Sequence, residues 1–134
     1  MNAVVDTNVA AYYLLGTEPF AEECQDFWKR VDEASAPSLW QAEIVNVLWM
    51  AVRNNVITPE ESAKKLRFAA GLGIHPIPVR QLWRGALFRS IDSGVSAYDT
   101  LFVELAIRRK LRLATFDSQL HRAFPEIARR PAAL

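Results

Sequence analysis

The sequence predicts an α/β fold, a three-layer α/β/α sandwich whose central sheet is mostly parallel. Short apolar runs of strand length alternate with helical patterns of a dozen or more residues, which is typical of βαβ units, and such units build parallel sheets covered by helices. The chain has 134 residues, 51% of them hydrophobic, and shows no repeat, low-complexity tract or flexible linker. We therefore expect one domain, spanning residues 1–134, with a core of its own.

The first half of the chain is predicted to be helical after one short strand. That strand covers residues 3–5 and ends at Asp6. The spacing of apolar residues then predicts helices from Val9, over residues 20–31 and over residues 39–54. The next helix has the clearest start, with Thr58 as N-cap, Pro59 at the first helical position and Glu61 at the third, and it should end near Gly71.

The second half is predicted to alternate strands and helices. Residues 74–79 read as a strand, which Pro76 and Pro78 would place at a sheet edge or shorten. A helix should follow from Gln81 to near Gly94, and Ser96 is a good N-cap for another that runs to Arg109. Residues 111–115 form a short apolar strand that leads to Asp117, and residues 118–123 form the last helix.

Composition and charge exclude several classes of protein. The formal net charge is only +1, so nucleic-acid binding would need locally grouped cations. Such groups occur at residues 64–67, 80–89 and 108–112, although solvated helix faces also explain them. Cys24 is the only cysteine, which rules out an intrachain disulfide and favours a reducing, cytoplasmic setting. No signal peptide or membrane span is expected, because the longest apolar run is far below the ~20 residues a span needs.

Four acidic residues are the candidates for chemistry. Asp6 and Asp117 each follow a predicted strand, Asp99 lies in the first turn of a helix, and Glu43 lies in a polar stripe on the mostly apolar helix 39–54. Each also has an ordinary explanation, as a helix cap or as part of a solvated face. Neither explanation accounts for the joint placement of the four acids. Ligands in such folds bind beyond the carboxyl ends of the strands, where these acids could meet. Asp92 fits an exposed helix end better than a site.

A cluster of these carboxylates would need a cation. Carboxylates a few ångströms apart repel and raise one another's pKa values, and Mg²⁺ or Mn²⁺ removes that cost. Oxygen-only ligands suit these two ions and argue against zinc. We interpret the two histidines, His75 and His121, as structural or surface residues.

The segments VVDTN, PSLWQAEIVNVLW, SAYDTLFVELA and LATFDSQL, in this order and spacing, resemble the PIN-domain family, and in particular its VapC-type toxins. The resemblance spans nearly the whole chain. It implies a ribonuclease in which Asp6, Glu43, Asp99 and Asp117 bind one or two Mg²⁺ or Mn²⁺ ions. It also implies a supporting hydroxyl at Thr115 and flanking polar side chains at Asn8 and Asn46.

The same resemblance implies RNA as substrate, a homodimer and a small antitoxin that obstructs the acidic pocket. Attack by water predicts 5′-phosphate and 3′-hydroxyl products, because the ribose 2′-hydroxyl is bypassed. The chain also has more large aromatic side chains than a core of this size needs, and any that are exposed would mark an interface. The aromatic residues concerned are Phe20, Phe27, Trp28, Trp40, Trp49 and Trp83.

Three other functions are alternatives for this sequence. A phosphatase with Asp6 as nucleophile would need a second acid two residues later, where this chain has Asn8. A nuclease acting on DNA would use the same metal site with a different groove. A non-catalytic PIN-like binding module would gain nothing from clustered carboxylates.

Overall fold

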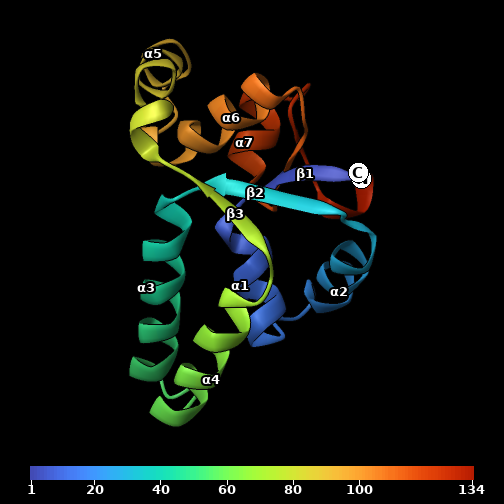
Figure 1. Cartoon of the computed structure of the whole chain (residues 1–134), viewed down its shortest axis with the longest axis vertical. Coiled ribbons are helices and arrows are strands. Elements are labelled where there is room, and N and C mark those ends of the chain that lie inside the picture. The colour runs from blue at the N-terminus through green and yellow to red at the C-terminus, as the bar shows by residue number, and fades with distance from the viewer.

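The computed structural model describes residues 1–134 and contains one sheet of five parallel strands in the order β3-β2-β1-β4-β5 (Figure 1). The strands are β1 (Asn2–Val5), β2 (Glu33–Pro37), β3 (Ile74–Ile77), β4 (Leu113–Ala114) and β5 (Ala128–Arg129). Strands β2 and β3 are added in turn on one side of β1, and β4 and β5 are added in turn on its other side. The strand order therefore reverses between β1 and β4, and ligands in open α/β sheets bind at such a point.

Helices cover both faces of this sheet, which confirms the predicted α/β/α sandwich (Figure 1). One face carries α1 (Thr7–Leu15), α2 (Ala21–Arg30), α3 (Leu39–Arg53) and α4 (Pro59–Ala70). The other carries α5 (Trp83–Ser93), α6 (Ala97–Arg109) and α7 (Ser118–Ala123). Two short 3₁₀ turns, Val79–Gln81 and Pro131–Ala133, complete the chain. No helix is both long enough and apolar enough to cross a membrane.

Helix α6 forms the centre of the core. It contacts β1, β2 and β4, and every residue from Thr100 to Ala106 is buried. The strands beneath it are equally buried, with Val4, Val5 and Leu113 at most 1% exposed. This packing fixes the start of α6, where Asp99 lies, relative to the ends of β1 and β4.

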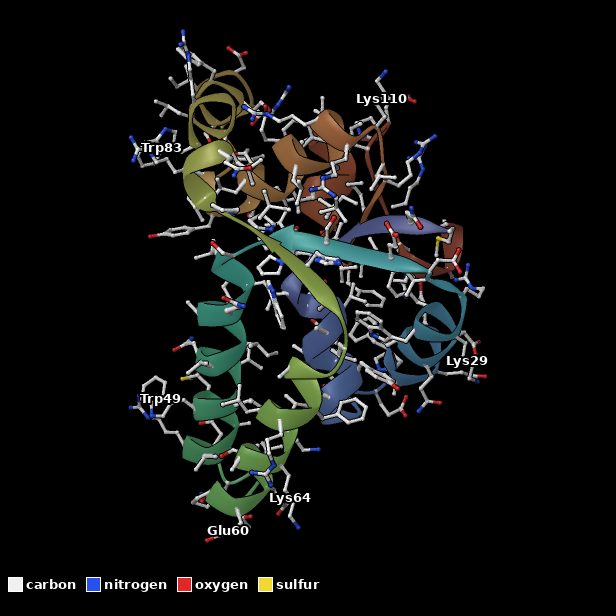
Figure 2. All side chains as sticks on the ribbon, viewed as in Figure 1. Lys29, Trp49, Glu60, Lys64, Trp83 and Lys110 are labelled. Atoms are coloured by element: carbon white, nitrogen blue, oxygen red, sulfur yellow. The ribbon has the colours of Figure 1, made fainter.

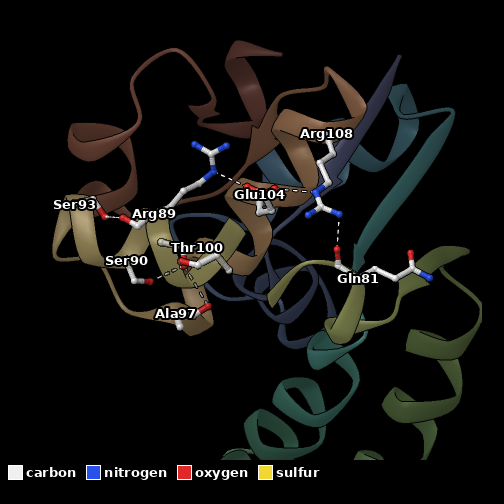
Figure 3. A network of polar contacts seen from close by, with 9 residues as sticks. Gln81, Arg89, Ser90, Ser93, Ala97, Thr100, Glu104 and Arg108 are labelled. Carbon is white, nitrogen blue, oxygen red and sulfur yellow. Dashed lines mark hydrogen bonds and ion pairs between the residues drawn. The ribbon is translucent and has the colours of Figure 1, made fainter. Parts of the chain in front are cut away.

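An ion-pair network around the buried Glu104 holds α5 against α6 (Figure 3). Glu104, only 5% exposed, accepts hydrogen bonds from Arg89 Nε at 2.6 Å and from Arg108 Nε at 2.8 Å. Burial raises the pKa of Glu104, but the two arginines lower it more, so the net shift is downward. Gly85 of α5 lies so close to the Glu104 carboxylate that there is no room for a side chain at position 85. Arg89 of the basic group 80–89 and Arg108 of the basic group 108–112 therefore belong to this network.

Two strands were not predicted, β2 and β5. The buried residues of β2 include Ala34, Ser35 and Ala36, which are small and lack the β-branched or aromatic side chains that favour strands. This segment is a strand because β1 and β3 pair with it on both sides. Strand β5 has only two residues, too few to give a sequence pattern.

The predicted elements differ from the structure mainly at their ends. Helix α1 begins at Thr7 instead of Val9, because Asp6 caps it. Helix α5 begins at Trp83, because the 3₁₀ turn takes up the residues before it. The strand predicted at 74–79 ends at Ile77 and lies at the sheet edge, as its prolines indicated. The capping box of Thr58 and Glu61 is confirmed, with bonds of 3.1 and 3.3 Å.

The large aromatic side chains divide between core and surface. Phe27 and Trp40 are buried, whereas Trp49 is 54% and Trp83 57% exposed. Trp49 projects outward from α3 and Trp83 from the start of α5 (Figure 2). The chain therefore carries aromatic surface outside its core.

Candidate functional site

A pocket of about 670 Å³ opens where the strand order reverses, beyond the carboxyl ends of β1 and β4. Its wall contains all four predicted acids, Asp6, Glu43, Asp99 and Asp117. Asn8 and Asn46 also line it, and no lysine, arginine or histidine does. The pocket is therefore a concentration of negative charge with no cationic side chain on its wall.

Asp6 is the most buried of the four acids, at 8% exposed. Its Oδ1 accepts the backbone N–H of Thr7 at 2.8 Å, which caps α1. Its Oδ2 accepts the hydroxyl of Thr115 at 2.7 Å and the amide of Asn8 at 3.4 Å. Burial raises the pKa of Asp6 to about 7, with further increases from Asp99 and Glu43, although the bonds from Thr115 and Thr7 act against the rise.

Thr115 and Asn8 connect the ends of β1 and β4. The Thr115 hydroxyl, which donates to Asp6, also accepts the backbone N–H of Asp117 at 3.0 Å. Asn8 donates to the same hydroxyl at 3.3 Å and accepts the backbone N–H of Phe116, also at 3.3 Å. Thr115 is fully buried behind the pocket wall, so it contacts the acids without facing the pocket itself.

Asp117 is the N-cap of α7. Its Oδ1 accepts the backbone N–H groups of Gln119 at 2.8 Å and Leu120 at 3.4 Å. Because both bonds go to Oδ1, the second carboxylate oxygen remains without a protein donor. The capping explanation considered for Asp6 and Asp117 is therefore correct, and both acids line the pocket as well.

Glu43 is held by Thr7, which is not among the site residues predicted from the sequence. The hydroxyl of Thr7 donates to Glu43 Oε1 at 2.7 Å and so joins α1 to α3. Burial raises the pKa of Glu43; the bond from Thr7 lowers it and the charge of Asp99 raises it. Thr7 belongs to the segment VVDTN, which resembles a PIN-domain motif, but only the fold shows that its hydroxyl faces α3.

Asp99 lies in the first turn of α6, and its pKa is raised by burial and by the nearby charge of Asp117. An acid at the third helical position can bond back to the N-cap amide, but Asp99 makes no such bond. Instead, the Ser96 hydroxyl donates to Asp99 Oδ2 at 3.4 Å, and Ser96 makes no side-chain cap of its own. Because Asp99 also raises the pKa values of Asp6 and Glu43, it is electrostatically coupled to every other acid of the pocket.

The remaining candidates lie at the margin of the pocket or outside it. Asn46, almost one turn beyond Glu43 on α3, lines the pocket, and its side chain makes no hydrogen bond within the protein. Asp92 is exposed on α5 and lies outside the pocket. His75 is exposed, and the ring of His121 bonds the Thr115 carbonyl at 2.7 Å, so both fit the structural or surface role expected.

The donor set fits a hard divalent cation. Carboxylate and amide oxygens line the pocket, and Mg²⁺ and Mn²⁺ take such ligands while keeping some water. No three histidine, cysteine, aspartate or glutamate side chains are grouped as a metal site in this conformation. The acids thus face one space, and their side chains would move closer together to share an ion.

Comparison with known proteins agrees with this geometry. The sequence profile of the PIN domain matches residues 3–124. The chain belongs to the PIN-domain family. A curated relative, ribonuclease VapC3 of Pyrobaculum aerophilum, is 27% identical over an alignment of 132 residues that covers 95% of this chain and 98% of that protein.

Two solved structures share the fold of this PIN domain at low sequence identity. VapBC2 from Rickettsia felis, bound to a DNA fragment from its promoter, is 15% identical with a TM-score of 0.67, over 97% of this chain and 98% of that one. A toxin–antitoxin complex from Klebsiella pneumoniae is 15% identical with a TM-score of 0.69, over 96% and 97%. The resemblance seen in the sequence segments is thereby confirmed.

Proposed function

We propose that this PIN domain is a metal-dependent endoribonuclease that hydrolyses RNA phosphodiester bonds to 5′-phosphate and 3′-hydroxyl ends. The observation that carries the proposal is that four carboxylates, from four separate segments, line one pocket without a cationic side chain. A pocket of this charge repels RNA unless a cation is bound. The relative named as a ribonuclease, matched over nearly its whole length, supports the same activity.

Asp6, Glu43, Asp99 and Asp117 would hold Mg²⁺ or Mn²⁺, which activates the attacking water and neutralises charge on the phosphate. The protein's part is to present these carboxylates in fixed positions. Thr115 and the Thr7 amide orient Asp6, the Thr7 hydroxyl orients Glu43, and the α7 amides orient Asp117. With its pKa at about 7, Asp6 would have to lose its proton for its carboxylate to hold a cation.

We further propose that this nuclease is the toxin of a toxin–antitoxin pair, acts in the cytoplasm and forms a homodimer. Two proteins that share its fold were solved as VapBC2 and as a toxin–antitoxin complex. The exposed tryptophans of α3 and α5, Trp49 and Trp83, supply apolar surface for an antitoxin or a second subunit. A single buried thiol, Cys24, suits a reducing compartment.

One observation favours a second candidate, a non-catalytic PIN-like module. The carboxylates are not grouped as a metal site in this conformation, which is also what a scaffold would show. Metal binding and RNA cleavage distinguish the two functions.

The test is incubation of the purified protein with total cellular RNA and Mn²⁺ or Mg²⁺, followed by mapping of new 5′ ends. Asp99→Asn and an EDTA control should abolish the new ends, whereas Asp92→Asn, an exposed acid outside the pocket, should not. Total DNA in a parallel reaction tests the alternative substrate. Absence of cleavage, or cleavage that survives Asp99→Asn, would favour the non-catalytic module.

A further inference from the structure

Tyr98 is an aromatic residue that the packing of the protein does not explain. It directly precedes Asp99, lines the pocket and is 68% exposed. Its ring contacts no other aromatic ring, and its hydroxyl makes no hydrogen bond within the protein. Tyr12, on the wall of the same pocket, is different, because its ring stacks on Phe20 at 4.6 Å and packs against the core.

The pocket has an apolar wall in addition to its acids. Ala11, Leu15, Leu39, Ala42 and Val47 line it beside the carboxylates. Since no lysine or arginine is present to bind phosphate, the uncharged part of the wall is the part that nucleic acid can contact favourably away from a bound cation. Nucleobases are the parts of RNA that suit such a surface, and they stack well on aromatic rings.

We propose that the Tyr98 ring stacks on a nucleobase next to the scissile phosphate, so that the pocket accepts an unpaired nucleotide. This inference rests on the proposed ribonuclease function. The position of Tyr98 beside Asp99 places an exposed ring next to a carboxylate expected to hold the cation. A base inside a duplex is already stacked on both faces, and only an unpaired base is free to stack on the protein.

Cleavage of a short single-stranded RNA that carries the mapped site tests the stacking. Tyr98→Ala should raise KM about 10- to 100-fold, the range that loss of one base–aromatic stack produces. Tyr98→Phe keeps the ring and should behave as the wild type does. Phe88→Ala, which removes a ring that is 54% exposed outside this pocket, should also leave KM unchanged.

Abasic substrates identify what the ring contacts. With the base removed at the stacking position, wild type and Tyr98→Ala should cleave with the same KM. If Tyr98→Ala cleaves the intact substrate as the wild type does, or if its defect persists on substrates abasic at each flanking position, the stacking is overturned.

A binding measurement separates this inference from the nuclease activity. Single-stranded RNA containing 2-aminopurine is titrated with protein in Ca²⁺, and stacking on Tyr98 should quench the fluorescence in wild type and Tyr98→Phe but not in Tyr98→Ala. Quenching without cleavage in Mn²⁺ would leave the stacking standing and refute the ribonuclease. RNA cleavage, combined with fluorescence quenching by Tyr98→Ala that equals the quenching by the wild type, would refute the stacking and leave the ribonuclease standing.

Discussion

The hydroxyl of Thr7 donates a 2.7 Å hydrogen bond to Oε1 of Glu43, which joins the first residue of α1 to the second turn of α3. The backbone N–H of the same residue donates to Asp6. Thr7 therefore orients two of the proposed metal ligands, one through its side chain and one through its main chain.

Thr7→Val should weaken Mn²⁺ binding about 10-fold, because removing a hydrogen bond that orients a ligand typically costs 10- to 100-fold in metal affinity. Isothermal titration calorimetry measures the change. Thr7→Ser retains the hydroxyl and is the matched control. Equal Mn²⁺ affinity in Thr7→Val and the wild type would show that Glu43 needs no such support.

Asp6 should make the stability of the metal-free protein depend on pH. Its pKa is about 7 in the folded chain, against an ordinary value of 3.8. Between these pH values the folded state keeps a proton that the unfolded state has released. The contribution of Asp6 to the free energy of unfolding is thus present at low pH, falls by up to about 1.4 kcal/mol per pH unit, and is lost above pH 7.

Urea denaturation in EDTA at pH values from 5 to 8 checks this slope. Asp6→Asn keeps a side-chain acceptor for the α1 cap but has no proton to lose, so its stability should vary less over the same range. A slope unchanged by Asp6→Asn would mean that Asp6 titrates outside this range.

Mn²⁺ should stabilise the folded protein if the pocket binds it. At a concentration 100 times the Kd, the gain is about 2.7 kcal/mol, which corresponds to a rise in melting temperature of several degrees. Asp99→Asn should lose most of this rise, and Asp92→Asn should keep it. A wild-type melting temperature indifferent to Mn²⁺ would favour the non-catalytic module.

Gly85→Ala should destabilise the protein by about 1–3 kcal/mol, the usual effect of overpacking. The added Cβ would overlap the carboxylate of Glu104, which Arg89 and Arg108 hold in place. This clash outweighs the gain of up to about 1 kcal/mol from replacing glycine within a helix. Urea denaturation measures the difference, and an increase in stability would show that Glu104 can move.

Gly71→Ala is the control for that substitution. A Cβ at Gly71 would come no closer than 3.4 Å to the Phe68 carbonyl oxygen, an ordinary contact. Its effect on the free energy of unfolding should be small.

The α/β/α sandwich and the acids of the pocket could be predicted because both correspond to local patterns in the amino-acid sequence. Asp6 and Asp117 follow apolar strands, and the carboxyl ends of parallel strands meet at one sheet edge. The orientation of Glu43 was not predictable, since the face of α3 that meets the sheet edge depends on how α3 packs. The same is true of Thr7, whose hydroxyl has a partner 36 residues away in the chain.

Strand β2 shows why part of the fold was missed. Its buried residues Ala34, Ser35 and Ala36 carry no strand preference, and it is pairing with β1 and β3 that makes them a strand. Small residues are nevertheless suitable there, because α3 and α6 both contact this strand.

The two helix caps in the pocket bear on how this protein would change in evolution. Asp6 accepts one backbone N–H group and Asp117 accepts two, so a descendant that no longer cleaved RNA would still be selected to keep an acceptor at both positions. Glu43 and Asp99 accept only side-chain hydroxyls and cap no helix. Among related sequences, the loss of these two acids, and not of the capping pair, should be the earliest mark of a lineage that has abandoned catalysis.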